Sequence, residues 1–134
     1  MNSANIKNYD LKNLSGKELS ELISKTMEPM PSDKNKERSP LGAWKLAMQI
    51  KDKERSLFWV PIDWLRTNNV ARLFDELIPP FSIVVFTRSD YTKSYSMKVE
   101  NPETGSYWLH YAATYERLIA EFWYIQNRNK TAYG

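Results

Sequence analysis

The segment FSIVVFT at residues 81–87 is followed by YSMKV at residues 95–99 and YWLHY at residues 107–111. All three segments are rich in aromatic and β-branched side chains, and the second alternates apolar with polar residues, which is typical of antiparallel strands. Polar turns separate them, one around residues 89–90 and one at residues 101–105. This order predicts a three-stranded antiparallel β-meander.

One helix is expected near the N-terminus, and another is expected directly after the meander. Ser15 and Glu18 have the spacing of a capping box, and the helix that starts there should end near Met27, before two prolines. Thr114 is expected to cap a C-terminal helix that packs on the sheet, with five residues on one helical stripe. That stripe consists of Tyr115, Leu118, Ile119, Phe122 and Gln126.

Residues 39–50 fit two different secondary structures. Ser39 and Pro40 are suited to the start of a helix, and most residues that follow are good helix formers, so a second helix is predicted here. The rival interpretation is a strand, because apolar side chains also alternate strictly along this segment. They are Trp44, Leu46, Met48 and Ile50.

The next apolar run, residues 57–61, is expected to be a brief strand or an extended segment that Pro61 ends. A third helix should begin near Asn68 or Asn69 and stop before two prolines. The fold class is therefore α+β, with N-terminal helices, the meander and the C-terminal helix packed on the sheet. Residues 1–13 are expected to be a loose, non-helical arm, and residues 14–130 one domain with an exposed connector at residues 28–39.

Composition argues against several classes of protein. The 134 residues include no cysteine, which excludes disulfides, thiolate catalysis and cysteine-based metal sites. His110 is the only histidine, the acids are scattered, and no glycine-rich phosphate motif occurs, so neither an enzyme nor a cofactor is expected. The N-terminus lacks signal-peptide features and no apolar run could span a bilayer, so a cytoplasmic location without membrane contact is expected.

The sheet suggests a binding surface. If Tyr95, Met97 and Val99 face the core together with Tyr107 and Leu109, other side chains project from the opposite face, beside a basic turn. The expected partner-binding residues are Arg88, Tyr91, Lys93, Lys98, Trp108 and His110. Such a basic and aromatic patch can bind a protein or stack on bases. The competing interpretation is that a helix covers this face and buries Trp108.

The segment DLKNLSGKEL at residues 10–19 resembles the first-helix signature of small phage accessory proteins of the NinX type. Trp59-Val60-Pro61, a helix that contains Ala71, a hairpin and a final helix with Arg117 and Ala120 are similar to the phage α/β/α sandwich domain. The resemblance implies a phage or prophage origin and an accessory role, such as interference with a host defence or a host enzyme. It implies no catalytic residues.

Two functions follow as hypotheses. The first is a protein that binds and inhibits or modulates a bacterial host protein, in the host cytoplasm. The second is a small nucleic-acid-binding module, since a net charge of +3 and a pI near 9.0 are mildly basic. The cations that could form its stripe are Lys34, Lys36, Arg38, Lys51, Lys53, Arg55, Arg88, Lys93 and Arg128.

Overall fold

The structure is a computed structural model that describes residues 8–87, 90 and 93–128. Its helices are η2 (Asn8–Asn13, a 3-10 helix), α1 (Gly16–Met27), α2 (Thr67–Asp75) and α3 (Tyr115–Asn127). Its strands are β1 (Trp44–Lys51), β2 (Glu54–Pro61), β3 (Ser82–Thr87), β4 (Lys93–Glu100) and β5 (Tyr107–Ala112).

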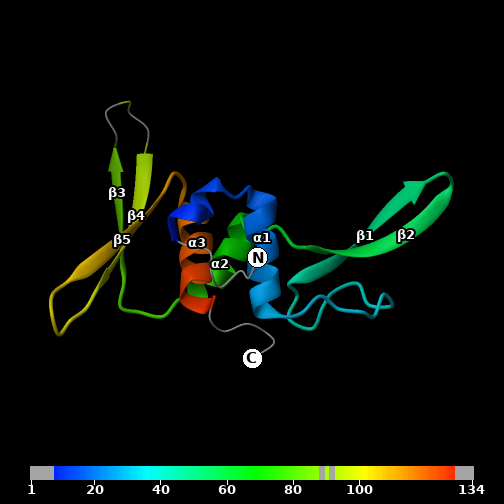
Figure 1. The fold of residues 1–134 in the computed structure, drawn as a ribbon, viewed down its shortest axis with the longest axis horizontal. Helices are drawn as coiled ribbons and strands as arrows, with labels where there is room; N and C mark the ends of the chain where they lie inside the picture. Colours follow the sequence, from blue (N-terminus) through cyan, green and yellow to red (C-terminus); the bar gives the residue numbers. More distant parts are fainter. Residues whose placement is uncertain (1–7, 88–89, 91–92, 129–134) are drawn as a thin grey trace.

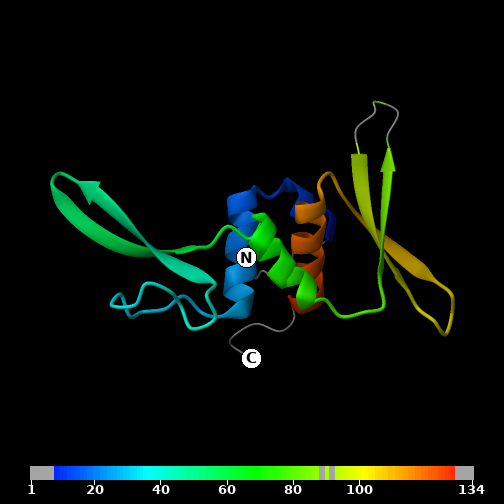
Figure 2. The ribbon, with the colours of Figure 1, turned by 180° about the vertical axis from the view of Figure 1, so that it is seen from behind.

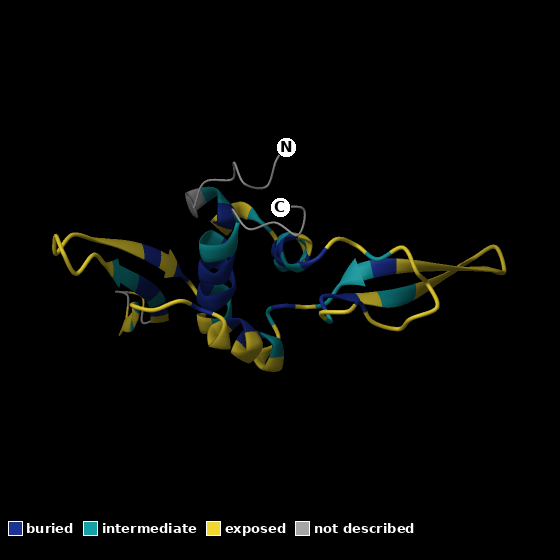
Figure 3. Cartoon of the chain, turned by 90° about the horizontal axis from the view of Figure 1, so that it is seen from below, coloured by how far each residue is buried: buried dark blue, intermediate teal, exposed yellow. Residues whose placement is uncertain are grey.

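The helices lie at the centre of an elongated molecule (Figure 1). The β1–β2 hairpin projects from one side, and the β3–β4–β5 sheet stands on the other, as the view from behind also shows (Figure 2). Buried residues gather in α1, in α3 and at the base of the hairpin, while most of α2 and the far end of the hairpin are exposed (Figure 3). The α+β class and the C-terminal helix packed on the sheet are confirmed, and the β1–β2 hairpin is a second sheet beside the predicted meander.

Helix α1 begins as the sequence predicts. The Ser15 hydroxyl accepts a hydrogen bond from the Glu18 amide at 3.1 Å, and the Glu18 carboxylate accepts one from the Ser15 amide at 3.0 Å. This capping box satisfies two backbone donors that a helix start leaves free. The helix then buries Leu19 and Ile23 completely in the core.

Ser15→Ala is expected to lower the free energy of unfolding by about 1 kcal/mol, because one cap is lost. Hydrogen bonds from the backbone and side chain of Ser15 lower the pKa of Glu18 below its ordinary value of 4.5. The stabilisation that comes from hydrogen bonds to the ionised Glu18 carboxylate is therefore complete above that value and is lost as the pH falls through the lower folded pKa, whereas the bond from the Glu18 amide to the Ser15 hydroxyl does not depend on this ionisation. In Ser15→Ala, an NMR titration should find the Glu18 pKa moved back towards the ordinary value. Ser32→Ala, in the exposed connector, is the control and should change neither the free energy of unfolding nor the pKa of Glu18.

The prediction of a helix over residues 39–50 is wrong, and the rival alternating pattern is right. Strands β1 and β2 pair antiparallel from Trp44↔Pro61 to Lys51↔Glu54, so β2 is also longer than the brief strand expected. Asp52 and Lys53 form the connection with φ of 53° and 67°, the left-handed conformation that a two-residue hairpin turn requires. Cross-strand packing outweighs the helix propensity of individual residues here.

The hairpin is tied to α1 at its base. The Glu28 carboxylate accepts hydrogen bonds from the amides of Leu41 at 3.0 Å and Ala43 at 3.2 Å, while the Trp44 indole donates to the Glu28 carbonyl at 3.2 Å. Glu28 and Ser39 are each only 6% exposed. The expectation that the whole connector is exposed is therefore corrected at both its ends.

Residues 8–13 also differ from the expected loose arm. They form η2, whose Leu11 is completely buried. The Arg117 guanidinium of α3 donates to the carbonyls of Leu11 at 2.6 Å and Leu14 at 2.7 Å, which fastens this segment to the helix. One apolar anchor and two charge-assisted hydrogen bonds order a segment whose sequence is otherwise polar. Residues 1–7 lie outside the described residues.

Helix α2 begins at Thr67, slightly before the two asparagines expected to cap it. The Asn69 side chain donates to the Asp63 carbonyl at 2.7 Å, and the N-cap position is held by Arg66, which makes no side-chain capping hydrogen bond. The start of α2 is thus uncapped.

Candidate functional sites

The structure separates the residues of the predicted patch. Arg88 and Tyr91 lie outside the described residues. Lys93 is exposed at the start of β4, and Lys98 is half-buried on the sheet face that points away from α3. Trp108 and His110 lie on the opposite face, so the expectation that they project together with Lys98 is wrong.

Only β5 has its two faces exchanged relative to the prediction. Tyr95, Met97 and Val99 face α3 as predicted, and the register sets Ala112, His110 and Trp108 directly opposite them on the same face. Trp108 packs on Phe122 with ring centroids 5.8 Å apart, although it stays 40% exposed.

His110 belongs to a buried polar network. Its Nε2 lies 2.7 Å from Oε1 of Glu121, whose other oxygen accepts a hydrogen bond from Arg117 at 2.5 Å. His110 is 4% exposed and Glu121 1% exposed. A carboxylate held by two partners away from solvent is suited to fixing α3 against β5 and η2.

The opposite face of the sheet, here called the outer sheet face, carries large apolar side chains. The register places Val84, Ser96 and Tyr111 in one row across the three strands, and their neighbours two residues away fall on the same face. The side chains of Ser94 and Ser96 lie buried between the larger ones. The outer sheet face consists of Val84, Phe86, Lys98, Tyr107, Leu109 and Tyr111.

Its aromatic rings are held in place by neighbours. Phe86 and Tyr111 meet edge to face, with centroids 6.1 Å apart. The ammonium of Lys98 lies 4.5 Å from the centroid of the Tyr107 ring, and that of Lys12 lies 5.7 Å from the centroid of the Tyr111 ring. The face therefore combines ordered apolar side chains with one cation on its central strand, Lys98, and a second, Lys12, beside Tyr111.

A second surface, here called the basic cleft, lies where the base of the hairpin meets the start of α2. It has a volume of about 360 Å³. Four cations and one acid line it, with two asparagines from the first turn of α2. Its charged and amide side chains are Arg38, Lys45, Asp63, Arg66, Asn68, Asn69 and Arg72.

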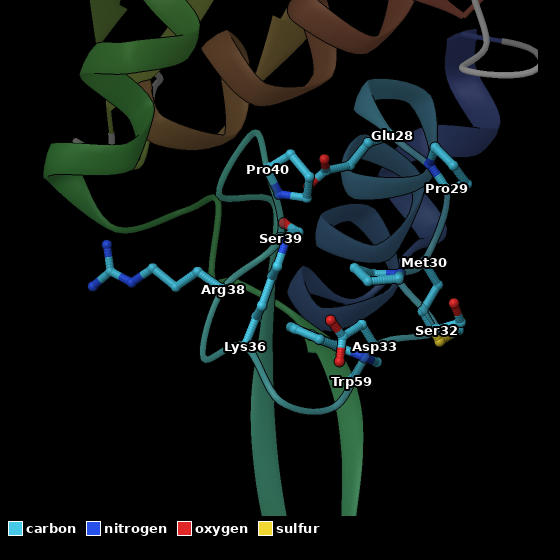
Figure 4. Close-up of a pocket in the computed structure, with 11 residues that line it drawn as sticks. Glu28, Pro29, Met30, Ser32, Asp33, Lys36, Arg38, Ser39, Pro40 and Trp59 are labelled. Carbon is cyan, nitrogen blue, oxygen red and sulfur yellow. The ribbon is translucent and has the colours of Figure 1, made fainter.

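A third hollow, of about 390 Å³, lies between the connector and the hairpin. Figure 4 shows Pro29, Met30 and Trp59 around it, with the Arg38 guanidinium extending away from the group. The Trp59 indole nitrogen is buried and has no hydrogen-bond partner among the described residues. The lining combines prolines, Met30 and Trp59 with charged side chains, which include Asp33 and Lys36.

Within residues 8–87, 90 and 93–128, no three histidine, aspartate or glutamate side chains are grouped so that they could hold a metal ion. In the same residues no helix is both long and apolar enough to cross a bilayer. No protein-family model matches the chain, and neither the curated proteins nor the solved structures that were searched include a similar one. The likeness to phage accessory proteins stays a prediction from the sequence.

Proposed function

We propose that this chain is a binding protein that docks a partner protein on its outer sheet face. The observation that carries the proposal is a group of five large apolar side chains on one side of a single sheet, all 37–59% exposed: Val84, Phe86, Tyr107, Leu109 and Tyr111. Exposed apolar surface costs about 25 cal/mol per Å² in water, and contiguous patches of it typically serve as interfaces.

The edge of the same sheet favours a polypeptide as the occupant. Strand β3 is an edge strand, and its sequence SIVVFT contains no charge and no proline, the residues that commonly protect an edge from pairing. An extended segment of another protein can pair with such an edge and lay alternate side chains beside the outer sheet face. The partner that fits the proposal is a bacterial host protein, as the resemblance to phage accessory proteins implies.

A photocrosslinking phenylalanine analogue in place of Tyr107, which is 59% exposed, tests this proposal in bacterial cells. We expect one dominant adduct with another protein. Val84→Lys should reduce its yield at least about tenfold, because a lysine there puts a charge inside an apolar interface. Ile50→Lys is the control: Ile50 is 62% exposed against 46% for Val84, but it lies in β1 of the other sheet, so its lysine adds a charge neither to the outer sheet face nor to the β3 edge.

Equal adduct yields with the two lysine variants would refute docking on the outer sheet face. An adduct of twice the mass of the chain would identify a second copy as the occupant and refute the host-protein target. Thermal melting of both variants checks that each is folded, and both positions are exposed enough to accept a lysine.

A further inference from the structure

The basic cleft points to a ligand that differs in chemistry from the partner of the outer sheet face. Its cations come from three parts of the chain: Arg38 precedes β1, Lys45 lies in β1, and Arg66 and Arg72 belong to the start and body of α2. Asp63 is the only acid that lines it. Gathering four positive charges around one cleft costs repulsion, which a bound anion relieves.

Three of these cations are available to a ligand. In the described part of the chain, the side chains of Arg38, Lys45 and Arg66 form neither a hydrogen bond nor an ion pair. Arg72 is held in position, because its guanidinium donates to the Leu41 carbonyl at 2.6 Å and lies 5.2 Å from the centroid of the Trp64 ring. The cleft thus combines one fixed cation with three that are free to bind.

The start of α2 adds to the attraction for an anion. Its N-cap has no side-chain hydrogen bond and its first turn contains no acid, although acids are the usual neighbours of the positive end of a helix. Asn68 and Asn69 lie in that turn and line the cleft. Phosphate groups are commonly bound where a helix start and basic side chains meet.

The positive charge continues beyond the cleft. Residues 34–72 contain nine of the nineteen lysines and arginines and four of the sixteen acids, a net charge of +5, of which the four cations and one acid of the cleft itself supply +3. Along the hairpin, the face that carries Lys45 also carries Gln49 and Lys51 of β1, with Ser56 and Glu54 of β2 opposite these two. A nucleic-acid strand that leaves the cleft along this face would meet the polar side chains of Gln49 and Ser56 and then Lys51.

We propose that the basic cleft seats a backbone phosphate of a nucleic acid, whose strand continues along the Lys45, Gln49 and Lys51 face of the hairpin. This site differs from the stripe expected from the sequence, since Lys93 lies in β4, on the opposite side of the helices from the hairpin (Figure 1). The inference is independent of the protein docking proposed above, which uses the outer sheet face.

Fluorescence anisotropy with labelled DNA of about 20 bases, single-stranded and duplex, tests the proposal over a range of salt concentrations. We expect binding whose affinity falls with salt. The double variant Lys45→Gln/Arg66→Gln should reduce the slope of log K against log salt by about 2 and the affinity at about 0.1 M salt by about tenfold. Neither side chain has a partner in the described structure, so the variant should fold normally, which its thermal melting checks.

Lys93→Gln is the control, because it removes the same type of charge from the other side of the molecule. Its affinity should stay within about twofold of the unaltered chain. Equal losses of affinity in Lys93→Gln and in the single variants Lys45→Gln and Arg66→Gln would mean that the attraction is diffuse, and would overturn the site. Absence of binding to either DNA would also overturn it, as would binding of a phosphoserine peptide in the cleft without binding of nucleic acid.

Discussion

Glu121→Ala is expected to lower the free energy of unfolding by about 3–5 kcal/mol, because it leaves buried partners without their carboxylate. Glu121 is 1% exposed and binds His110 and Arg117 with its two oxygens, at 2.7 Å and 2.5 Å. Arg117 would lose the carboxylate that orients it, and its hydrogen bond to the Leu11 carbonyl would weaken as a result. Urea denaturation measures the loss, and hydrogen exchange should become faster at residues 8–13.

Glu21→Ala is the matched control for this prediction. Glu21 also pairs with a cation four residues away on a helix, Lys25 at 2.9 Å, but its side chain is 47% exposed. Exposed pairs of this kind contribute about 0.3–0.5 kcal/mol. If the two alanine variants lost equal stability, the burial of the Glu121 network would not be what stabilises the junction of α3, β5 and η2.

The elements that sequence predicts well have strong local signals. The capping box of Ser15 and Glu18 determines the start of α1 through contacts only three residues apart, and Thr114 caps α3 in the same way. The β-branched run in β3 and the alternation in β4 identify strands before any tertiary contact is considered. These signals suffice for the meander and the helix that packs on it.

The hairpin lacked such signals. Its turn is Asp52-Lys53, without the glycine or asparagine that normally marks a two-residue connection, and β1 is built largely of helix formers. The alternation of apolar and polar side chains from Trp44 onward correctly indicated a strand, but the helix propensity of the individual residues favoured a helix. Pairing with β2, which no local rule anticipates, decides the structure.

The positions of the two proposed binding surfaces depend on which way the side chains of β5 face and on contacts between residues far apart in the sequence. Strand β5 has large side chains on both faces, so its alternation could not tell that Trp108 faces α3 and that Tyr107 and Leu109 face outward. The basic cleft brings Arg38 next to Arg66 and Arg72 although about thirty residues separate them. Only the packing of the hairpin base on the start of α2 makes them neighbours.

Trp64→Ala is expected to cost about 3–5 kcal/mol, since it empties a large site in the core and removes a hydrogen bond. Trp64 is completely buried, and its indole donates to the Ser24 hydroxyl at 2.9 Å, which in turn donates to the Ala43 carbonyl at 2.8 Å. The indole thereby connects the chain after β2 to α1 and to the base of β1. Denaturation should be accompanied by faster hydrogen exchange at the paired ends of the hairpin.

The matched control is Trp108→Ala, which removes the same side chain from a site where it is 40% exposed and should cost less than half as much. The hydrogen bond can be separated from the packing with Trp64→Phe, Ser24→Ala and the double variant, for which we expect a coupling energy of about 0.5–1.5 kcal/mol. A coupling near zero would leave packing alone as the role of Trp64. Equal losses of stability in Trp64→Ala and Trp108→Ala would contradict the prediction, because the loss should be larger for the more buried side chain. The base of the hairpin would then not depend on the Trp64 indole.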